Sequence, residues 1–140
     1  MKAFLAKNIV YIAWIQSIVA TLGSLYYSEI RHFTPCTLCW YQRILMYPLV
    51  IIIAVGILRR DKKLYQYVLP MSILGWFIAF YHVLLQRGII PEAIAPCTLG
   101  ASCITKYTGY LGFITIPVMS LTAFTVITLC MIVYRKVQQK

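Results

Sequence analysis

The sequence predicts an all-α membrane protein, a bundle of four transmembrane helices that forms a single domain over residues 1–140. Hydrophobic residues make up 61% of the chain, whereas Lys and Arg together number 13 and Asp and Glu only 3. A soluble domain of this length needs a charged shell and would not present so much apolar surface. Four apolar runs approach or reach the length of about 20 residues that a helix needs to cross a bilayer.

The expected spans are residues 9–27, 39–58, 67–86 and 112–134. The first run follows a charged start, but it is longer than the apolar part of a signal peptide and no convincing cleavage site follows it, so we expect it to remain as a span. Pro48 falls inside the second span, where proline is tolerated and usually produces a kink. Pro70 is expected in the first turn of the third span, where its missing N–H has no intrahelical use.

Basic residues lie at the ends of the apolar runs, which is the placement of topology signals. One side carries nine of them (Lys2, Lys7, Arg59, Arg60, Lys62, Lys63, Arg135, Lys136 and Lys140) and the other carries four (Arg31, Arg43, Arg87 and Lys106). The excess predicts that both termini face the cytoplasm and that two loops are extracytoplasmic. The net charge of +10 is thus explained by topology, and we expect no binding of nucleic acid.

Four of the five cysteines, Cys36, Cys39, Cys97 and Cys103, lie in or next to the two outer loops. Disulfides persist on the oxidising side of a bacterial membrane. Four cysteines allow three pairings, and the short spacings favour Cys36–Cys39 and Cys97–Cys103. Cys130 lies within the fourth span and is expected to pack as a small apolar residue.

The Cys36–Cys39 pair is predicted to be a redox couple. A bridge that closes so short a loop removes little entropy from the unfolded chain, so it is a weak structural staple. The pair also precedes a helix, whose N-terminal dipole favours a thiolate. For Cys97–Cys103, a redox role and a loop staple remain equally open. The spacing does not exclude a zinc site built from the four thiols, but the oxidising surroundings argue against it, and no metal is expected.

Arg43 and His82 are the candidate partners of this pair. Arg43 follows Cys39 by one helical turn, so the two share a helix face. Its guanidinium either reaches to the membrane surface or stabilises a Cys39 thiolate and donates hydrogen bonds to an electron acceptor. His82 lies near the outer end of the third span, in the same layer, although a lone histidine there is more often structural.

Net oxidation by two disulfides requires an electron acceptor. The chain has no nucleotide-binding glycine motif, and its acidic residues, Glu29, Asp61 and Glu92, are few and scattered. Its two histidines make a bis-histidine haem improbable. A lipid-soluble quinone, dissolved in the bilayer beside Cys39 and Arg43, is the simplest acceptor.

The motif Pro-Cys-x-Leu-Cys-x-Tyr-x-Arg at residues 35–43 closely resembles the DsbB family of disulfide-forming quinone reductases. The short segment between Cys97 and Cys103 is most similar to the BdbC branch from Gram-positive bacteria, whereas longer members carry a large segment there. The resemblance covers essentially the whole chain, including Tyr81-His82 and residues 112–117. It implies a multi-pass protein of the cell membrane whose active site is extracytoplasmic.

The resemblance also implies a relay. A reduced thioredoxin-like thiol oxidase of the DsbA or BdbD type attacks the Cys97–Cys103 disulfide, at Cys97, and leaves with its own disulfide. Cys103 then attacks Cys36, and Cys39 is released as a thiolate.

In the same resemblance, the Cys39 thiolate faces a quinone of the menaquinone or ubiquinone type. Arg43 would polarise a ring carbonyl of this quinone, and His82 would be its neighbour.

Two other classes are weighed against this enzyme. A small four-span transporter or channel usually needs an acid within the membrane, but Glu29, Asp61 and Glu92 all fall in predicted loops or at their edges. A non-catalytic scaffold stapled by disulfides would keep both bridges permanently oxidised.

Overall fold

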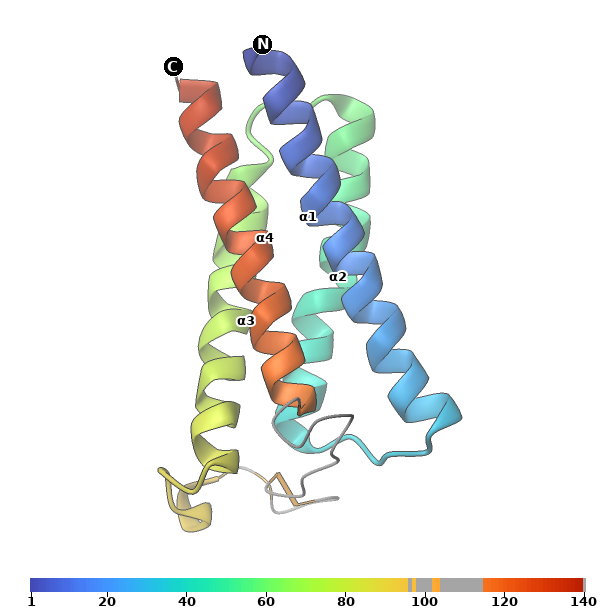
Figure 1. Cartoon of the computed structure of the whole chain (residues 1–140), viewed down its shortest axis with the longest axis vertical. Coiled ribbons are helices and arrows are strands. Elements are labelled where there is room, and N and C mark those ends of the chain that lie inside the picture. Colours follow the sequence, from blue (N-terminus) through green and yellow to red (C-terminus); the bar gives the residue numbers. More distant parts are fainter. Residues whose placement is uncertain (96, 98–101, 104–114, 140) are drawn as a thin grey trace.

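The computed structural model describes residues 1–95, 97, 102–103 and 115–139, in which long helices dominate (Figure 1). The helices are α1 (Lys2–Leu25), which continues into the π-helical turn η1 (Tyr26–Ile30), α2 (Thr37–Arg59), α3 (Tyr65–Gln86), the 3₁₀ turn η2 (Glu92–Ile94) and α4 (Ile116–Gln139). Within the described residues, four of these segments are long and apolar enough to cross a membrane. The predicted fold class, an all-α membrane protein with four spanning helices, is confirmed.

The helices extend further than the apolar runs. α1 begins at residue 2 rather than 9, and α4 ends at residue 139 rather than 134, because backbone hydrogen bonding continues where charged side chains have already begun. α3 begins at Tyr65, so Pro70 lies in its second turn. The prediction that Pro70 lies in the first turn was wrong. α2 is continuous through Pro48. Residues 112–114, Lys106 and Lys140 lie outside the described residues.

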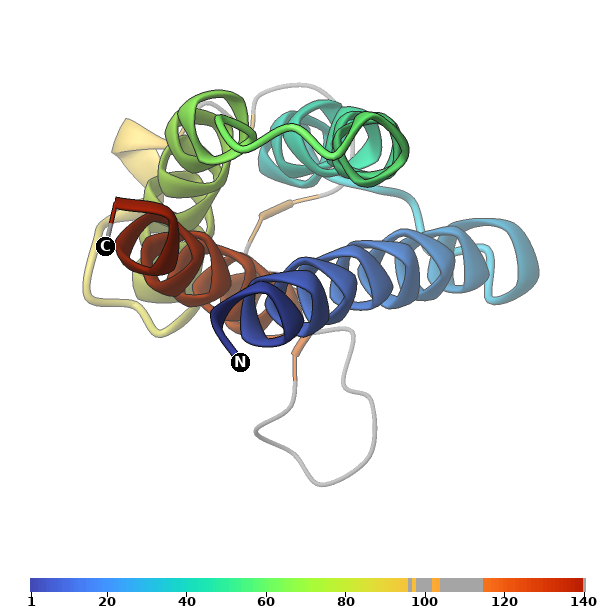
Figure 2. The ribbon, with the colours of Figure 1, turned by 90° about the horizontal axis from the view of Figure 1, so that it is seen from above.

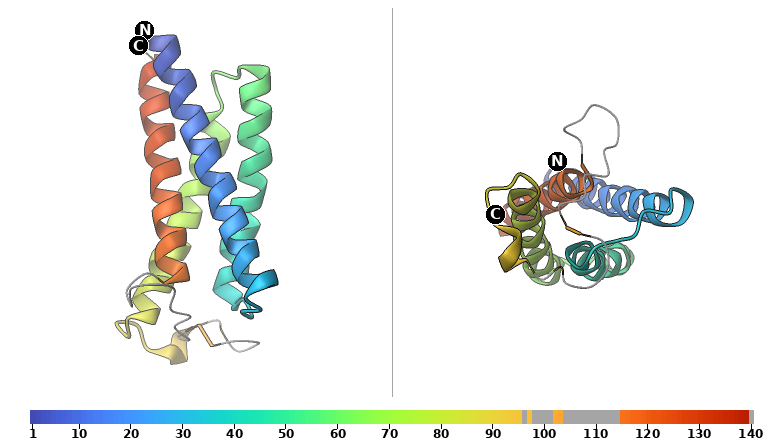
Figure 3. Two further views of the ribbon diagram at one scale, coloured as in Figure 1. Left: turned by 45° about the vertical axis from the view of Figure 1, so that its right-hand side comes forward. Right: turned by 90° about the horizontal axis from the view of Figure 1, so that it is seen from below.

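Both termini and the connection between α2 and α3 lie at one end of the bundle (Figure 1). The segment 31–36 and η2 lie at the opposite end, which we call the loop end. α1 runs obliquely across the bundle, and its own loop end lies away from α4 (Figures 2 and 3). The helices are therefore less closely packed around α1 at the loop end.

Interlocking side chains join α3 to α4 in the middle of the bundle. Gly75 faces Phe124 so closely that a Cβ atom at Gly75 would overlap the phenyl ring. The Trp76 indole N–H donates to Thr125 Oγ1 at 2.9 Å, and the Thr128 hydroxyl donates to Ser72 Oγ at 3.1 Å. Such bonds satisfy polar groups that would otherwise face hydrocarbon.

The end of the bundle that carries the termini is also tied together. Arg60 closes α2 in the left-handed conformation, with φ of 51°. The Tyr134 hydroxyl of α4 donates to the Asp61 carbonyl at 3.0 Å, and Leu64, 2% exposed, packs on Gly56. Cys130 is a free thiol packed against the core, as predicted.

We predict that Gly75→Ala lowers the thermal unfolding midpoint of the protein in detergent, because the new methyl group overlaps the Phe124 ring. Overpacking of this kind costs about 1–3 kcal/mol. Gly23→Ala is the matched control, since nothing lies within 4 Å of a Cβ built at Gly23. Equal midpoints for the two variants would contradict the close packing of α3 on α4.

Candidate functional site

Cys36 is the N-cap of α2. Its backbone is extended, with φ of −76° and ψ of 169°, and its Sγ accepts the Cys39 backbone N–H at 3.3 Å. The sulfur thus takes the place of the Ser, Thr or Asp oxygen that commonly satisfies a free N–H at a helix start. The predicted position of the cysteine pair at a helix N-terminus is confirmed.

The sulfurs of Cys36 and Cys39 lie 2.7 Å apart, and both residues are free thiols. The disulfide expected between them, whose S–S bond would be about 2.05 Å long, stays a prediction. The two sulfurs are close enough to join or separate with little movement of the helix start, as a redox couple requires.

Cys97 and Cys103 are joined by a disulfide. Cys103 is only 2% exposed and belongs to a small buried cluster with Cys36, Leu38 and Leu85, whereas Cys97 is half-buried at its edge. The structure thus brings the second cysteine pair against the first. Sequence reasoning assigned both pairs to the outer side but could not establish that they touch.

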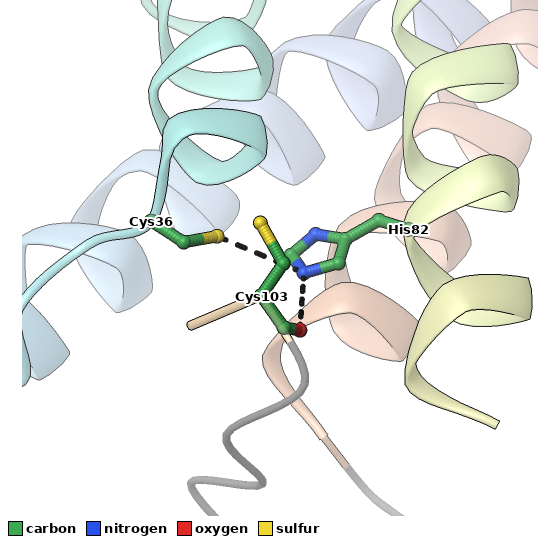
Figure 4. Close-up of side chains that lie close together, drawn as sticks. All are labelled: Cys36, His82 and Cys103. Atoms are coloured by element: carbon green, nitrogen blue, oxygen red, sulfur yellow. Dashed lines mark hydrogen bonds between the residues drawn. The ribbon is translucent and has the colours of Figure 1, made fainter. Parts of the chain in front are cut away.

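His82 of α3 contacts one cysteine of each pair (Figure 4). Its Nε2 atom is 3.7 Å from Cys36 Sγ and 3.3 Å from the Cys103 carbonyl oxygen. The ring is 2% exposed. The layer predicted for His82 is thus correct, and its neighbours are the cysteines of both pairs.

Gln42 is a polar residue of this site that sequence reasoning missed. It follows Cys39 by one turn of α2, is 5% exposed, and places its Nε2 atom 3.1 Å from His82 Nδ1. The signal available in the sequence was an amide side chain beside an arginine in an otherwise apolar helix. Such a group must find a hydrogen-bond partner when it is buried.

Arg43 joins α2 to α1. Its Nη2 atom donates to the Ser24 carbonyl at 3.0 Å, and its guanidinium lies 5.5 Å from the centre of the Trp40 ring. Cys39, one turn earlier in α2, lines the same cavity as Arg43. The shared face predicted for these two residues is therefore present.

A cavity of about 150 Å³ lies beside the cysteines, between the loop ends of α1, α2 and α4. Apolar side chains such as Val19, Met46 and Ala123 line it, together with Cys36, Cys39, Arg43 and His82. A mostly apolar cavity with a few polar groups is the usual form of a site for a small organic molecule.

The donor atoms of Cys36, His82 and Cys103 all lie within 4.8 Å of one another, a spacing that a metal ion can bridge. However, the Cys103 sulfur is engaged in a disulfide and does not offer the thiolate that a zinc ion binds. The geometry is better suited to exchange between thiols and disulfides.

The hydrogen bond from the Cys39 side chain lowers the pKa of Cys36 to about 4. Burial opposes this shift, and the His82 ring and the Cys39 backbone N–H reinforce it. The reduced pair thus holds its negative charge on Cys36. A thiolate is the reactive form of cysteine in disulfide exchange.

We predict that the reaction of Cys36 with a small alkylating reagent keeps its rate from neutral pH down to about pH 4, because the lowered pKa keeps the thiolate populated. In Cys39→Ala the main hydrogen bond is lost, so the rate should already fall below about pH 8, near the ordinary pKa of a thiol. Mass spectrometry of the Cys36 peptide measures both rates. Cys130→Ala is the control, and identical profiles for Cys39→Ala and the unaltered protein would contradict the assignment.

Comparison with known proteins agrees with this site. A family model described as "Disulfide bond formation protein DsbB" matches residues 6–134. Disulfide bond formation protein C of Bacillus subtilis (strain 168) is 49% identical over 121 residues, which are 86% of this chain and 88% of that protein. No solved structure matches the chain.

Two further relatives extend the match. The probable disulfide formation protein C of Halalkalibacterium halodurans is 44% identical over 124 residues, 89% of this chain and 90% of the relative. The SPbeta prophage-derived disulfide bond formation protein B of Bacillus subtilis (strain 168) is 41% identical over 128 residues, 91% and 85% of the two chains. With two cysteine pairs in contact at one end of a four-helix membrane bundle, and with these relatives, the chain belongs to the DsbB family of disulfide bond formation proteins, in its disulfide formation protein C branch.

Proposed function

We propose that this disulfide formation protein takes electrons from a thioredoxin-like thiol oxidase outside the cytoplasm and passes them to a quinone in the membrane. Its family supports a role in thiol oxidation. The observation that carries the finer proposal is the contact between the two cysteine pairs in one buried cluster, beside a cavity between the helices. The Cys97–Cys103 pair would exchange with the partner, and the Cys36–Cys39 pair with the quinone.

The proposed orientation places both termini in the cytoplasm and the loop end outside. It is supported by the excess of Lys and Arg near the termini and the connection between α2 and α3. An oxidising compartment at the loop end is also where the Cys97–Cys103 disulfide would persist.

The first step is an attack by a partner thiolate on the Cys97 sulfur. Cys97 is half-buried whereas Cys103 is 2% exposed, so Cys97 is the sulfur that a partner reaches. The bond between Cys97 and Cys103 breaks, a mixed disulfide forms, and Cys103 leaves as a thiolate. The second thiol of the partner then attacks the mixed disulfide, which leaves the partner oxidised and Cys97 and Cys103 reduced by two electrons.

The second step moves these electrons inward. The Cys103 thiolate attacks Cys36 in an oxidised Cys36–Cys39 pair, and Cys39 leaves as a thiolate. Cys97 then attacks Cys103, which restores the Cys97–Cys103 disulfide and leaves Cys36 and Cys39 as the dithiol. In this cycle, the combination of an outer disulfide and an inner dithiol is the state that is ready to reduce quinone.

The cavity lining fits a quinone, because a flat apolar ring needs apolar walls and a few donors for its carbonyl oxygens. A quinone held there would accept two electrons and two protons to give a quinol, and the Cys36–Cys39 disulfide would form again. Arg43 donates one N–H to the Ser24 carbonyl and has further N–H donors for a carbonyl oxygen of the quinone. The same charge stabilises a thiolate on Cys39 whenever Cys36 is engaged in a disulfide with Cys103.

We predict that Cys36→Ser and Cys39→Ser each abolish the reduction of decylubiquinone by a reduced thioredoxin-like protein, because either change removes the inner disulfide. The assay follows quinone absorbance in right-side-out and inverted vesicles. Activity is expected only where the loop end faces the added protein. Cys130→Ala is the control and should turn over normally. Turnover in either serine variant would refute the proposed relay, and activity only in inverted vesicles would reverse the orientation.

We predict that Arg43→Ala raises the KM for quinone about 10-fold or more, the cost of losing a hydrogen bond to a charged group. Arg31→Ala is the matched control, since Arg31 is also a cation of the loop end but stacks on Phe33 and does not line the cavity. Steady-state kinetics at fixed thiol concentration separate KM from kcat. An unchanged KM in Arg43→Ala would remove Arg43 from the quinone site.

A further inference from the structure

The buried pair of Gln42 and His82 joins α2 to α3 at the centre of the site. Both side chains are almost completely buried, at 5% and 2% exposed, and Gln42 Nε2 lies 3.1 Å from His82 Nδ1. Two polar groups between apolar helices are costly unless each is hydrogen-bonded. This pair is satisfied, and its position beside the reacting sulfurs calls for a chemical explanation.

The Cys103 carbonyl indicates the tautomer of His82. A carbonyl oxygen only accepts, so His82 Nε2, which lies 3.3 Å from it, carries a proton. In a neutral imidazole Nδ1 is then unprotonated and accepts from the Gln42 amide. Nε2 also lies 3.7 Å from Cys36 Sγ (Figure 4). The ring N–H therefore points at both cysteine pairs.

We propose that Gln42 is a positioning residue for the exchange between the two cysteine pairs: it holds His82 with the proton on Nε2, aimed at Cys36 and at the Cys103 backbone. This inference rests on the proposed function. Gln42 itself touches neither sulfur in this role and acts through the imidazole.

The Nε2–H has two consequences for exchange. When the Cys103 thiolate attacks Cys36, a bond forms between these sulfurs as the Cys36–Cys39 bond breaks, and negative charge passes across the Cys36 sulfur to Cys39. A fixed donor beside Cys36 stabilises that charge without having to reorient. The bond to the Cys103 carbonyl also keeps the attacking residue close to its target.

With its proton on Nδ1, the His82 ring would neither stabilise the negative charge near Cys36 nor hold the Cys103 backbone. Its Nε2 would then present a lone pair to the thiolate and to the carbonyl oxygen, and both contacts would become repulsive. By donating to Nδ1, Gln42 acts with the Cys103 carbonyl to favour the tautomer in which His82 promotes exchange.

The test measures the tautomer and the rate in the full chain. Nitrogen-15 NMR of labelled histidine, with His82→Phe used to assign the signal, reports which ring nitrogen carries the proton. Dithiothreitol as electron donor and decylubiquinone as acceptor report turnover. We expect the unaltered protein to show the proton on Nε2, and a proton on Nδ1 would overturn the proposal without any Gln42 variant.

Gln42→Met keeps the length of the side chain and removes the donor. We expect kcat to fall about tenfold, the order of magnitude for losing one buried hydrogen bond, with the KM for quinone unchanged and the Nε2–H signal weakened in favour of Nδ1–H. Gln42→Glu offers an acceptor in place of the donor, so it should move the proton to Nδ1 and slow exchange further. Ser72→Ala is the control, because it removes the hydrogen bond of a buried hydroxyl but lies far from the cysteines along α3. It should leave kcat and the tautomer of His82 unchanged.

A double variant decides whether Gln42 acts through the imidazole. Adding Gln42→Met to His82→Phe should cause no further loss, and an additional loss would overturn the proposal. So would a normal kcat in Gln42→Met, or a change in KM alone. Failure of the unaltered protein to reduce decylubiquinone with dithiothreitol would instead refute the proposed function, while the tautomer measured by NMR would still test the hydrogen bond from Gln42.

Discussion

The Cys36 sulfur is the atom on which the site depends. A helix that enters a bilayer leaves its first N–H groups without intrahelical partners, and these must be satisfied before the chain reaches hydrocarbon. Here Cys36 accepts one of them, from Cys39, and the same sulfur contacts the Cys39 thiol and His82. The bond that starts α2 and the bonds that hold negative charge on the thiolate therefore share one atom. The reactive sulfur thus lies where the start of α2 needs a hydrogen-bond acceptor in any case.

Hydropathy and spacing were sufficient to predict the four spanning helices and the cysteine pair at the start of the second one. They could not predict the contact between Gln42 and His82, because it depends on how α2 and α3 are rotated about their axes, and two nearly uniformly apolar helices leave that rotation undetermined. The helix ends and the position of Pro70 were missed for a related reason. Hydropathy marks the part of a helix within the lipid, whereas hydrogen bonding continues beyond it.

The predicted thiolate on Cys39 and the lowered pKa of Cys36 belong to different stages of the proposed cycle. In the free dithiol, the Cys39 side chain donates to Cys36, which holds the charge beside His82. Once Cys36 is bonded to Cys103, only Cys39 is left to carry charge, and it lies one turn from Arg43. In the proposed cycle, His82 would therefore serve the exchange between the pairs, and Arg43 would serve the cavity. A single thiolate position could not satisfy both tasks.

The distribution of packing through the bundle explains how this site can remain open. Gly75 against Phe124, and Tyr134 bound to the Asp61 carbonyl, fix the middle and the terminal end of the helices. Because these contacts hold the helices together, the loop end of α1 can lie away from α4 (Figure 3). The cavity lies beside this end of α1. Closing it with larger side chains would gain apolar contact for the fold but would fill the cavity that Cys39 lines. The enzyme thus concentrates its stability away from the helix ends at which its chemistry takes place.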